Sequence, residues 1–352
     1  MSVSASEQMA GSERVIAAVR GQEVDRFPLV TPTSVVTVES MTVTGVYFPE
    51  AHTDPYKMAA LAAAGHELLG FDTVIPYFSI LLEAAALGCE VDWNSVDAMP
   101  AIKINPLKNL LERKWDWRPP ANFLDRQPVK ALLVAIRLLK KRYGRRVAVV
   151  GKVIGPWTLA YHLCGVQDFL LGLVLEPEAV RELLERLLAV PLRLAVAEIE
   201  AGVDVLTWAD HATSDLVSAA AYRDFLLPLH QRAMEQLAGS CPVILHTCGR
   251  ATDRVAYFAR AGFTAFHFDS RNPVGDLLSL ANGRLNLIGG INNPQTLLNG
   301  KVKEVRATIE GLLQAGIKMV APECAVPLRT PNQNLRAIVQ AVRDFSRRHR
   351  KV

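Results

Sequence analysis

Residues 147–154 read VAVVGKVI and residues 203–208 read VDVLTW, and a helical pattern over Pro177–Ala201 lies between them. Apolar residues recur at helical spacing in that pattern, for example at Val180 and Leu183, which predicts a helix with one buried face. The two flanking runs are short and almost wholly apolar, which is typical of strands buried on both faces. A strand, a helix and a second strand in this order predict parallel pairing through a helical crossover.

The same alternation continues along the chain, with further helical patterns over Val302–Ala315 and Pro331–Phe345. Eight strand-helix units predict a closed (β/α)₈ barrel, or TIM barrel, with a core over about residues 24–345. An open doubly wound sheet is the alternative, but such sheets usually carry a glycine-rich phosphate turn, and the chain has neither GxGxxG nor a Walker motif. The eight expected strands are Phe27–Thr31, Thr73–Tyr77, Val147–Ile154, Val203–Trp208, Val243–Thr247, Thr264–Asp269, Leu285–Gly290 and Met319–Ala321.

Two connections are long, namely residues 32–72 after the first expected strand and 78–146 after the second. Insertions of this kind lie at the catalytic mouth of a barrel, where they form walls, lids or docking surfaces. The chain has 352 residues and shows no repeat, low-complexity tract or linker. We therefore expect a single TIM-barrel domain over residues 1–352.

Composition excludes several classes of protein. Half of the residues are apolar and 21% are charged, which excludes a mostly disordered chain. The net charge of +4 is weak evidence for nucleic-acid binding, and no apolar run approaches the roughly 20 residues that span a bilayer. Five cysteines are too few for a disulfide scaffold, and no secretory signal is recognisable. We expect a cytoplasmic protein that binds neither nucleic acid nor membrane.

Candidate metal ligands stand at the ends of two expected strands. His246 and Cys248 end the fifth strand, and side chains two apart on a strand point the same way. Cys324 follows the eighth strand, which opens onto the same central cavity. One histidine and two cysteines leave a fourth position for substrate, as in a catalytic zinc site. Asp269 is the first candidate for a fourth ligand and Glu323 the second. The alternative is a chance spacing of buried core residues.

Two further polar residues follow the fourth expected strand. Asp210 and His211 therefore face the same mouth, where they are candidates for binding the acceptor or orienting a ligand. The alternative is a helix-capping aspartate beside a surface histidine. His267 lies on the sixth strand below Asp269, and we interpret it as a hydrogen-bonded core residue.

Several stretches carry a family resemblance: Phe48–Ala62, Gly151–Thr158, His246–Gly249, Leu287–Gly300 and Pro322–Leu335. In this order and over most of the chain, they resemble the uroporphyrinogen decarboxylase superfamily, specifically its methylcobamide:coenzyme M methyltransferase branch. The zinc motif of that branch, His-x-Cys with a distant Cys, matches His246, Cys248 and Cys324. A carboxylate at the position of Asp269 can occupy the metal in relatives, and Glu83 stands where this branch keeps a glutamate near the mouth, in a substrate-binding or supporting role.

The resemblance implies methyl transfer from a methylated corrinoid to a thiol, such as coenzyme M, bound to Zn²⁺. Homocysteine and tetrahydrofolate are alternative acceptors, so the acceptor is a thiol or a pterin. The sequence lacks the Asp-x-His-x-x-Gly loop of a corrinoid domain, and the donor is therefore expected on a small partner corrinoid protein that docks at the insertions. From another class, the chain could be a non-catalytic binding module for zinc and corrinoid proteins.

Decarboxylation of uroporphyrinogen is not expected. Relatives with that activity carry an arginine-rich stretch after the first strand, and residues 31–36 here read TPTSVV. They also carry an essential aspartate after the second strand, where this chain has Ser79. Without that carboxylate, no anion stabilises the protonated pyrrole intermediate.

Overall fold

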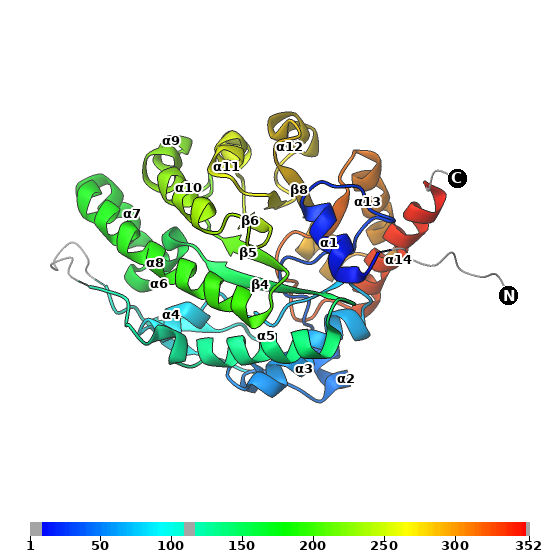
Figure 1. Ribbon diagram of the computed structural model, residues 1–352, viewed down its shortest axis with the longest axis horizontal. Helices are drawn as coiled ribbons and strands as arrows, with labels where there is room; N and C mark the ends of the chain where they lie inside the picture. Colours follow the sequence, from blue (N-terminus) through cyan, green and yellow to red (C-terminus); the bar gives the residue numbers. More distant parts are fainter. Residues whose placement is uncertain (1–8, 109–116, 350–352) are drawn as a thin grey trace.

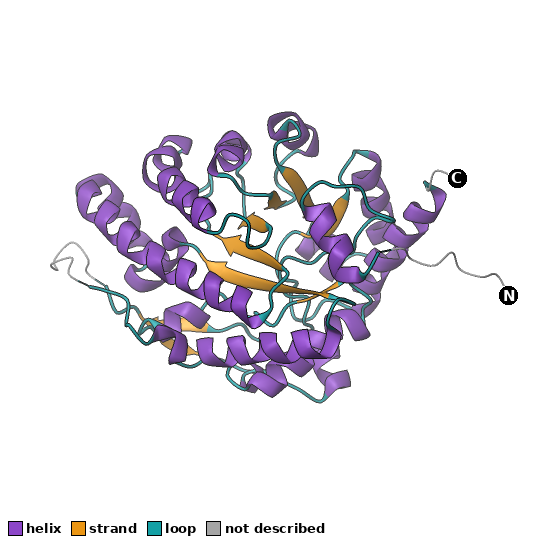
Figure 2. Ribbon diagram, in the orientation of Figure 1, coloured by secondary structure: helices purple, strands orange, loops and turns teal. Residues whose placement is uncertain are grey.

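The computed structural model of the protein describes residues 9–108 and 117–349. Seven parallel strands form a curled sheet that helices surround, and the first and last helices, α1 (Gly11–Val19) and α14 (Asn332–Arg348), lie on the same side of it (Figure 1, Figure 2). The order of the strands in the sheet follows the chain, which confirms the predicted barrel-type α/β fold. These strands are β1 (Thr73–Val74), β4 (Ala148–Ile154), β5 (Val205–Ala209), β6 (Val243–Thr247), β7 (Ala265–Phe268), β8 (Asn286–Ile291) and β9 (Met319–Pro322).

The first expected strand needs a correction, because Phe27–Thr31 is not a strand in the described part of the chain. The segment still runs beside β1, where the N–H of Asp72 donates to the carbonyl of Leu29. However, the N–H of Leu29 donates to the Asp72 side chain, and that of Thr31 to the Thr73 hydroxyl. Side chains thus replace the backbone acceptors of a sheet ladder, and Pro28 has no N–H to offer.

The helices follow the strands as the pattern predicts. The pattern over Pro177–Ala201 gave both ends of α8, which begins with proline at its first position and ends before Gly202 at φ 114°. The helices are α1 (Gly11–Val19), α2 (Val38–Thr44), α3 (Pro55–Glu67), α4 (Leu82–Ala86), α5 (Val129–Tyr143), α6 (Pro156–Cys164), α7 (Val166–Leu175), α8 (Pro177–Ala201), α9 (Ala219–Ala221), α10 (Leu227–Gln236), α11 (Val255–Ala261), α12 (Val274–Ala281), α13 (Val302–Gln314) and α14 (Asn332–Arg348).

An apolar plug closes the lumen at the amino ends of the strands. Helix α1 packs Val15 and Val19 against one interior cluster with the first inward-facing residues of the strands. Those strand residues include Ala148 of β4, Val205 of β5 and Ile244 of β6. Because side chains alternate along a strand, the residues two positions further on also face the lumen, one layer closer to the mouth.

The two long connections contain defined elements. Residues 32–72 hold α2 and α3, and α3 begins at Pro55 with Asp54 as its cap. Residues 78–146 hold α4, α5 and an antiparallel hairpin that the sequence did not predict, formed by β2 (Glu90–Asp92) and β3 (Ala101–Ile104). The single-domain organisation over residues 1–352 stays a prediction.

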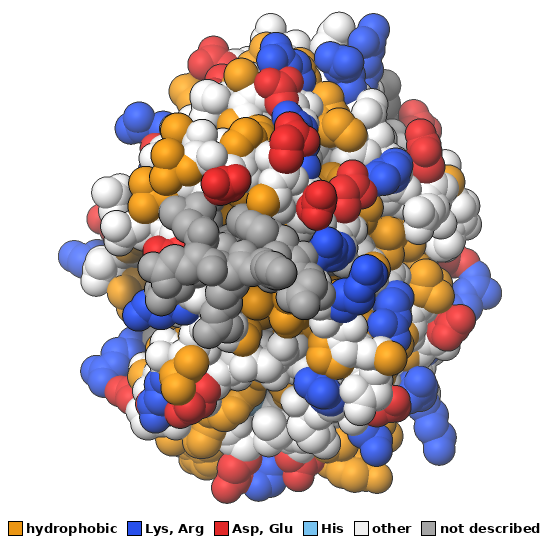
Figure 3. Space-filling view, turned by 90° about the vertical axis from the view of Figure 1, so that its left-hand side faces the viewer, with side chains coloured by type: hydrophobic (Ala, Val, Ile, Leu, Met, Phe, Trp, Pro, Cys, Tyr) orange, Lys and Arg blue, Asp and Glu red, His pale blue; other side chains and the backbone are white. Residues whose placement is uncertain are grey.

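The charges on the surface and the lengths of the described helices bear on binding to nucleic acid and to membranes. On the face shown in Figure 3, basic and acidic side chains are interspersed. In the described ranges, no single helix is long and apolar enough to cross a membrane. The bent pair α6 and α7, which meet at 110°, passes such a test by length and composition alone.

Candidate metal centre

Three side chains from two distant parts of the chain meet at the mouth. The Cys248 sulfur lies 3.0 Å from the Cys324 sulfur and 3.1 Å from Nε2 of His246. The third side of this triangle, from the Cys324 sulfur to Nε2 of His246, is 3.5 Å. We call these three residues the His-Cys-Cys triangle. The structure therefore brings together the three ligands that the sequence predicts.

The triangle suits a zinc ion in both donor type and size. Tetrahedral zinc with ordinary bonds to sulfur and nitrogen sets its ligand atoms about 3.5–3.8 Å apart. The observed sides are shorter by less than about 1 Å, a difference that rotation of the cysteine side chains can supply. His246 is fully buried at the end of β6, and its ring lies 4.6 Å from that of His267 on the adjacent strand.

The two cysteines share a proton when no metal holds them. The Cys248 thiol donates to the Cys324 sulfur, and this hydrogen bond is the main cause that lowers the pKa of Cys324 to about 7. The same hydrogen bond and burial raise the pKa of Cys248 well above its ordinary value. One thiolate is thus present near neutral pH, which favours capture of a cation.

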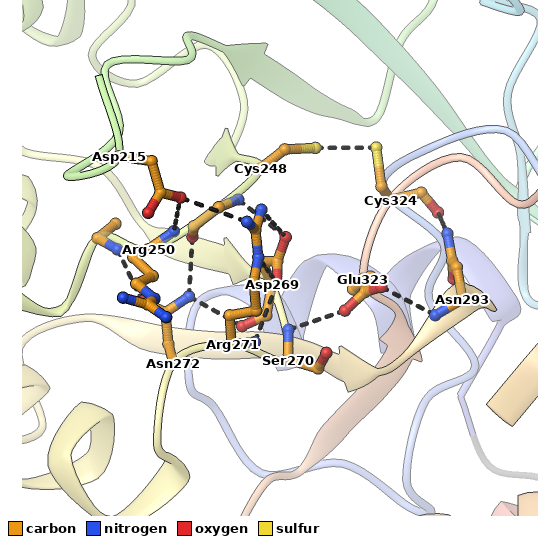
Figure 4. Close-up of polar contacts among 12 residues, drawn as sticks. Asp215, Cys248, Arg250, Asp269, Ser270, Arg271, Asn272, Asn293, Glu323 and Cys324 are labelled. Atoms are coloured by element: carbon orange, nitrogen blue, oxygen red, sulfur yellow. Dashed lines mark hydrogen bonds and ion pairs between the residues drawn. The ribbon is translucent and has the colours of Figure 1, made fainter. Parts of the chain in front are cut away.

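Backbone contacts fix the loop that carries Cys324. The Glu323 carboxylate accepts N–H groups from Ser270 and Asn293, both at 2.9 Å (Figure 4). The side-chain amide of Asn293 donates to the backbone carbonyl of Cys324 at 3.2 Å. Glu323, the second candidate for the fourth ligand, thus uses both oxygens to tie β9 to its neighbours.

Asp269, the first candidate for a fourth ligand, lies beside the triangle but is already occupied. Its carboxylate accepts the N–H of Gly249 at 2.8 Å and forms an ion pair with Arg271 at 3.1 Å (Figure 4). Hydrogen bonds and the charge of Arg271 lower the pKa of Asp269 against the opposing effect of burial. Arg271 also pairs with Asp215, so Asp269 would have to leave this network to reach a metal.

Asp210 lies behind the site. It is 2% exposed, and its carboxylate accepts the N–H of Thr158, which caps α6. The other oxygen contacts Nε2 of His230 at 3.0 Å, and Nδ1 of that ring contacts the Tyr222 hydroxyl. Both carboxylate oxygens of Asp210 are thus engaged within the fold, and the helix that Asp210 stabilises is α6, which precedes it, rather than the segment that follows it.

His211 lies at the triangle. Its Nδ1 accepts the N–H of Cys248 at 3.2 Å, and the ligand atoms of His211, His246 and Cys248 lie within 4.8 Å of one another. The backbone N–H of His211 donates to the Thr158 hydroxyl. Burial, assisted by the charge of Lys152, lowers the pKa of His211 to about 3. A neutral imidazole is thus held where it can orient Cys248 or contact a ligand.

Glu83 is fully buried rather than open to the mouth. One oxygen accepts the Tyr77 hydroxyl, and the other accepts the N–H of Ile154 at 2.8 Å. Burial raises the pKa of Glu83 to about 7. This geometry favours a supporting role for Glu83 over direct contact with substrate.

Sequence reasoning missed Lys152, which lies on the lumen side of β4. The signal was present, because a single lysine interrupts the apolar run VAVVGKVI. Its charge lowers the pKa of both cysteines of the triangle and of His246. His267, in contrast, is a hydrogen-bonded core residue as interpreted, since its Nε2 contacts the carbonyl of Pro322 at 2.8 Å.

An open donor set of one histidine and two cysteines, at the carboxyl ends of barrel strands, defines a barrel protein with a candidate catalytic metal centre. The sequence profile described as uroporphyrinogen decarboxylase (URO-D) matches residues 10–345, and the chain belongs to this family. The chain is 32% identical over 339 residues to a methylcobamide:CoM methyltransferase of Methanosarcina barkeri, covering 94% of this chain and 97% of the relative.

Two further relatives come from Methanosarcina mazei. The chain is 32% identical over 341 residues to a methylated-thiol–coenzyme M methyltransferase, covering 96% of this chain and 90% of the relative. A solved structure described as a methyltransferase superposes with a TM-score of 0.91 at 30% identity, covering 96% of this chain and 99% of that one.

Proposed function

We propose that the protein is a zinc-dependent methyltransferase that moves a methyl group from a methylated corrinoid to the thiol of coenzyme M. The observation that carries this proposal is the His-Cys-Cys triangle, whose sides are 3.0–3.5 Å. The printed names of two relatives, each 32% identical over almost the whole chain, support both the donor and the acceptor.

His246, Cys248 and Cys324 would hold the zinc, which lowers the pKa of a bound thiol so that it is a thiolate at neutral pH. The acceptor sulfur attacks the methyl carbon while the cobalt–carbon bond breaks. The bonding electron pair stays with cobalt, which leaves as cob(I)alamin. The proton of the acceptor thiol passes to solvent at the mouth. His211 holds the backbone of Cys248 in place during this exchange.

The methyl donor is proposed to arrive on a separate corrinoid protein. The sequence lacks the Asp-x-His-x-x-Gly loop that holds a corrinoid in its base-off form. The insertions at 32–72 and 78–146 are the proposed docking surface, because such loops surround the mouth of a barrel. Homocysteine or tetrahydrofolate as acceptor, and a binding module without turnover, remain the alternatives to be tested.

The description of the family names decarboxylation, but this chain lacks the residue that decarboxylation needs. Ser79 stands where decarboxylases carry their aspartate, and it is 3% exposed. Its hydroxyl accepts the N–H of Leu81 at 3.2 Å, which is a local turn contact. A neutral hydroxyl at this point provides no anion for a protonated pyrrole, so we propose methyl transfer instead.

The test is a spectral assay of zinc-loaded protein with free methylcobalamin. Coenzyme M, homocysteine and tetrahydrofolate are offered separately, with chelator-treated protein as the control. Zinc-dependent loss of the methylcobalamin spectrum with coenzyme M is the expected result. Turnover with another acceptor alone would replace coenzyme M in the proposal. Silence with all three, and also with methylated corrinoid protein as donor, would overturn catalysis in favour of a binding module.

A further inference from the structure

Lys152 lies inside the barrel, close to the two cysteines of the His-Cys-Cys triangle. It shares a strand face with Ala148, which belongs to the interior plug, because residues four apart on a strand point the same way. The sheet register pairs Lys152 with Thr207 and Thr207 with Ile244. The strands are staggered, however, and the plug holds Ala148 and Ile244 in one layer. Lys152 lies four residues beyond that layer and His246 two, so Lys152 is one layer closer to the mouth than His246 and level with Cys248.

The ammonium of Lys152 forms no ion pair with a carboxylate within residues 9–108 and 117–349. The side chain is only 4% exposed, yet no carboxylate of the described chain lies within ion-pair distance of its Nζ. The nearby Glu83 carboxylate is taken by the Tyr77 hydroxyl and the N–H of Ile154. The remaining contact is the Tyr77 ring, whose centre lies 5.3 Å from Nζ. The Cys324 and Cys248 sulfurs and Glu83 lie near enough to act on this ammonium, but none of them forms a direct ion pair with it. The acidic group of a ligand would supply that direct pair to a buried ammonium.

The arginines near the mouth are less suited than Lys152 to bind an anionic ligand. Arg271 is paired with Asp269 and Asp215, and Arg329 is exposed and paired with Asp97. Arg250 is also exposed. Lys152 is thus a cation that faces the lumen and has no carboxylate partner in the described chain. Burial lowers the pKa of Lys152, while the nearby Cys324 and Cys248 sulfurs raise it, so its charge acts within reach of the triangle.

We propose that Lys152 binds the acidic group of the methyl acceptor, so that the site selects small thiols carrying a sulfonate or a carboxylate over neutral thiols. This inference rests on the proposed function, because it takes the acceptor sulfur to lie at the triangle. Coenzyme M has its sulfonate two carbons from its thiol. The flexible four-carbon stem of lysine lets the ammonium reach across the lumen to such a group.

The first test compares acceptors in zinc-loaded protein. Coenzyme M, 3-mercaptopropionate and neutral 2-mercaptoethanol are assayed with the native chain, Lys152→Met and Lys152→Arg. Loss of one charge-assisted contact should lower kcat/KM of Lys152→Met for the two anionic thiols by about 10- to 150-fold, mainly through KM, with little change for 2-mercaptoethanol. Lys152→Arg should recover part of the anion preference. An equal loss for all three thiols would overturn the proposal, because Lys152 would then act on the sulfur alone.

The second test needs neither zinc nor turnover. Ethanesulfonate has the acid group but no thiol, and its binding to metal-free protein is measured by ligand-observed NMR against neutral ethyl methyl sulfone. Binding of the sulfonate alone, lost in Lys152→Met and kept in Lys318→Met, is expected, since Lys318 is exposed before β9. Equal binding to the native chain and Lys152→Met, with unchanged thermal unfolding, would overturn the proposal. Failure of the proposed function would instead appear as no methyl transfer to any thiol.

Discussion

The sulfur atoms of Cys248 and Cys324 lie 3.0 Å apart, although 76 residues separate them along the chain. Each cysteine follows a different strand of the curled sheet, and the curvature of the sheet brings the ends of these strands to one point. These two half-buried thiols are free and share a hydrogen bond, and their spacing also suits a cation that both can bind. The proposed partner is zinc, and the remaining donor of the triangle is His246.

Removing either cysteine should remove the metal and the activity together. Cys248→Ala and Cys324→Ala each leave two protein ligands, so zinc affinity should fall by more than the about 10- to 100-fold that loss of a supporting residue costs. Zinc content after dialysis and demethylation of methylcobalamin measure the two effects. Cys241→Ala is the matched control, because that thiol lies outside the triangle. A Cys324→Ala protein with one zinc per chain and normal turnover would refute the site.

Metal-free protein should react at Cys324 before its other cysteines. Since the pKa of Cys324 is lowered to about 7, its thiolate fraction and its rate of alkylation by iodoacetamide should rise as the pH increases through 7. Burial raises the pKa of three others to about 12, and these should stay unreactive: Cys89, Cys164 and Cys241. Peptide mapping by mass spectrometry gives the rate at each site.

The matched variant for this alkylation experiment is Cys248→Ala. It removes the hydrogen bond that is the main cause of the lowered pKa of Cys324. The reactivity profile of Cys324 should therefore move to higher pH in the variant. Identical profiles with and without Cys248 would contradict the shared proton, and zinc should protect Cys324 in the native chain.

Most of the fold could be predicted from the sequence, because buried parallel strands and amphipathic helices have different periods. The strand Val243–Thr247 and the helix Pro177–Ala201 have the bounds expected. The segment Phe27–Thr31 was misassigned for a physical reason. An apolar run predicts burial beside β1, which the segment has, but not whether side chains or backbone will satisfy its N–H groups.

The candidate site could likewise be predicted only in part from the sequence. His246, Cys248 and Cys324 could be found from the sequence because their chemistry is rare and their positions end strands. The positions of residues along the sequence did not predict which of their side chains would be buried. Asp210 and Glu83 follow strands as a substrate-binding residue would, but their oxygens turn toward backbone groups and neighbouring side chains. The importance of Lys152 depends on which groups share its lumen layer, and that is a property of the closed sheet.

His211→Ala should separate support of the triangle from stability of the fold. It removes the acceptor for the N–H of Cys248, and loss of such a supporting contact lowers metal affinity about 10- to 100-fold. Zinc affinity measured by competition with a chelator tests this, with thermal unfolding as the stability readout. Asp210→Ala is the contrasting variant, because it leaves the buried His230 ring without its hydrogen-bond partner and should cost about 1–3 kcal/mol of stability. Unchanged zinc affinity in His211→Ala would contradict its supporting role.

Glu83 should make the free energy of unfolding fall as the pH rises from about 4.5 to 7. Burial raises its pKa from 4.5 to about 7, so the folded chain holds a proton that the unfolded chain has lost in this window. The stabilisation is complete below the unfolded pKa and is lost through the folded pKa, and its size is about 3 kcal/mol. Glu83→Gln mimics the neutral acid beside Tyr77 and should remove this part of the pH dependence. Urea unfolding of both proteins at pH 4.5 and 7.5 measures the change in the free energy of unfolding between these pH values. An equal change in both proteins would show that Glu83 is ionised in the folded chain.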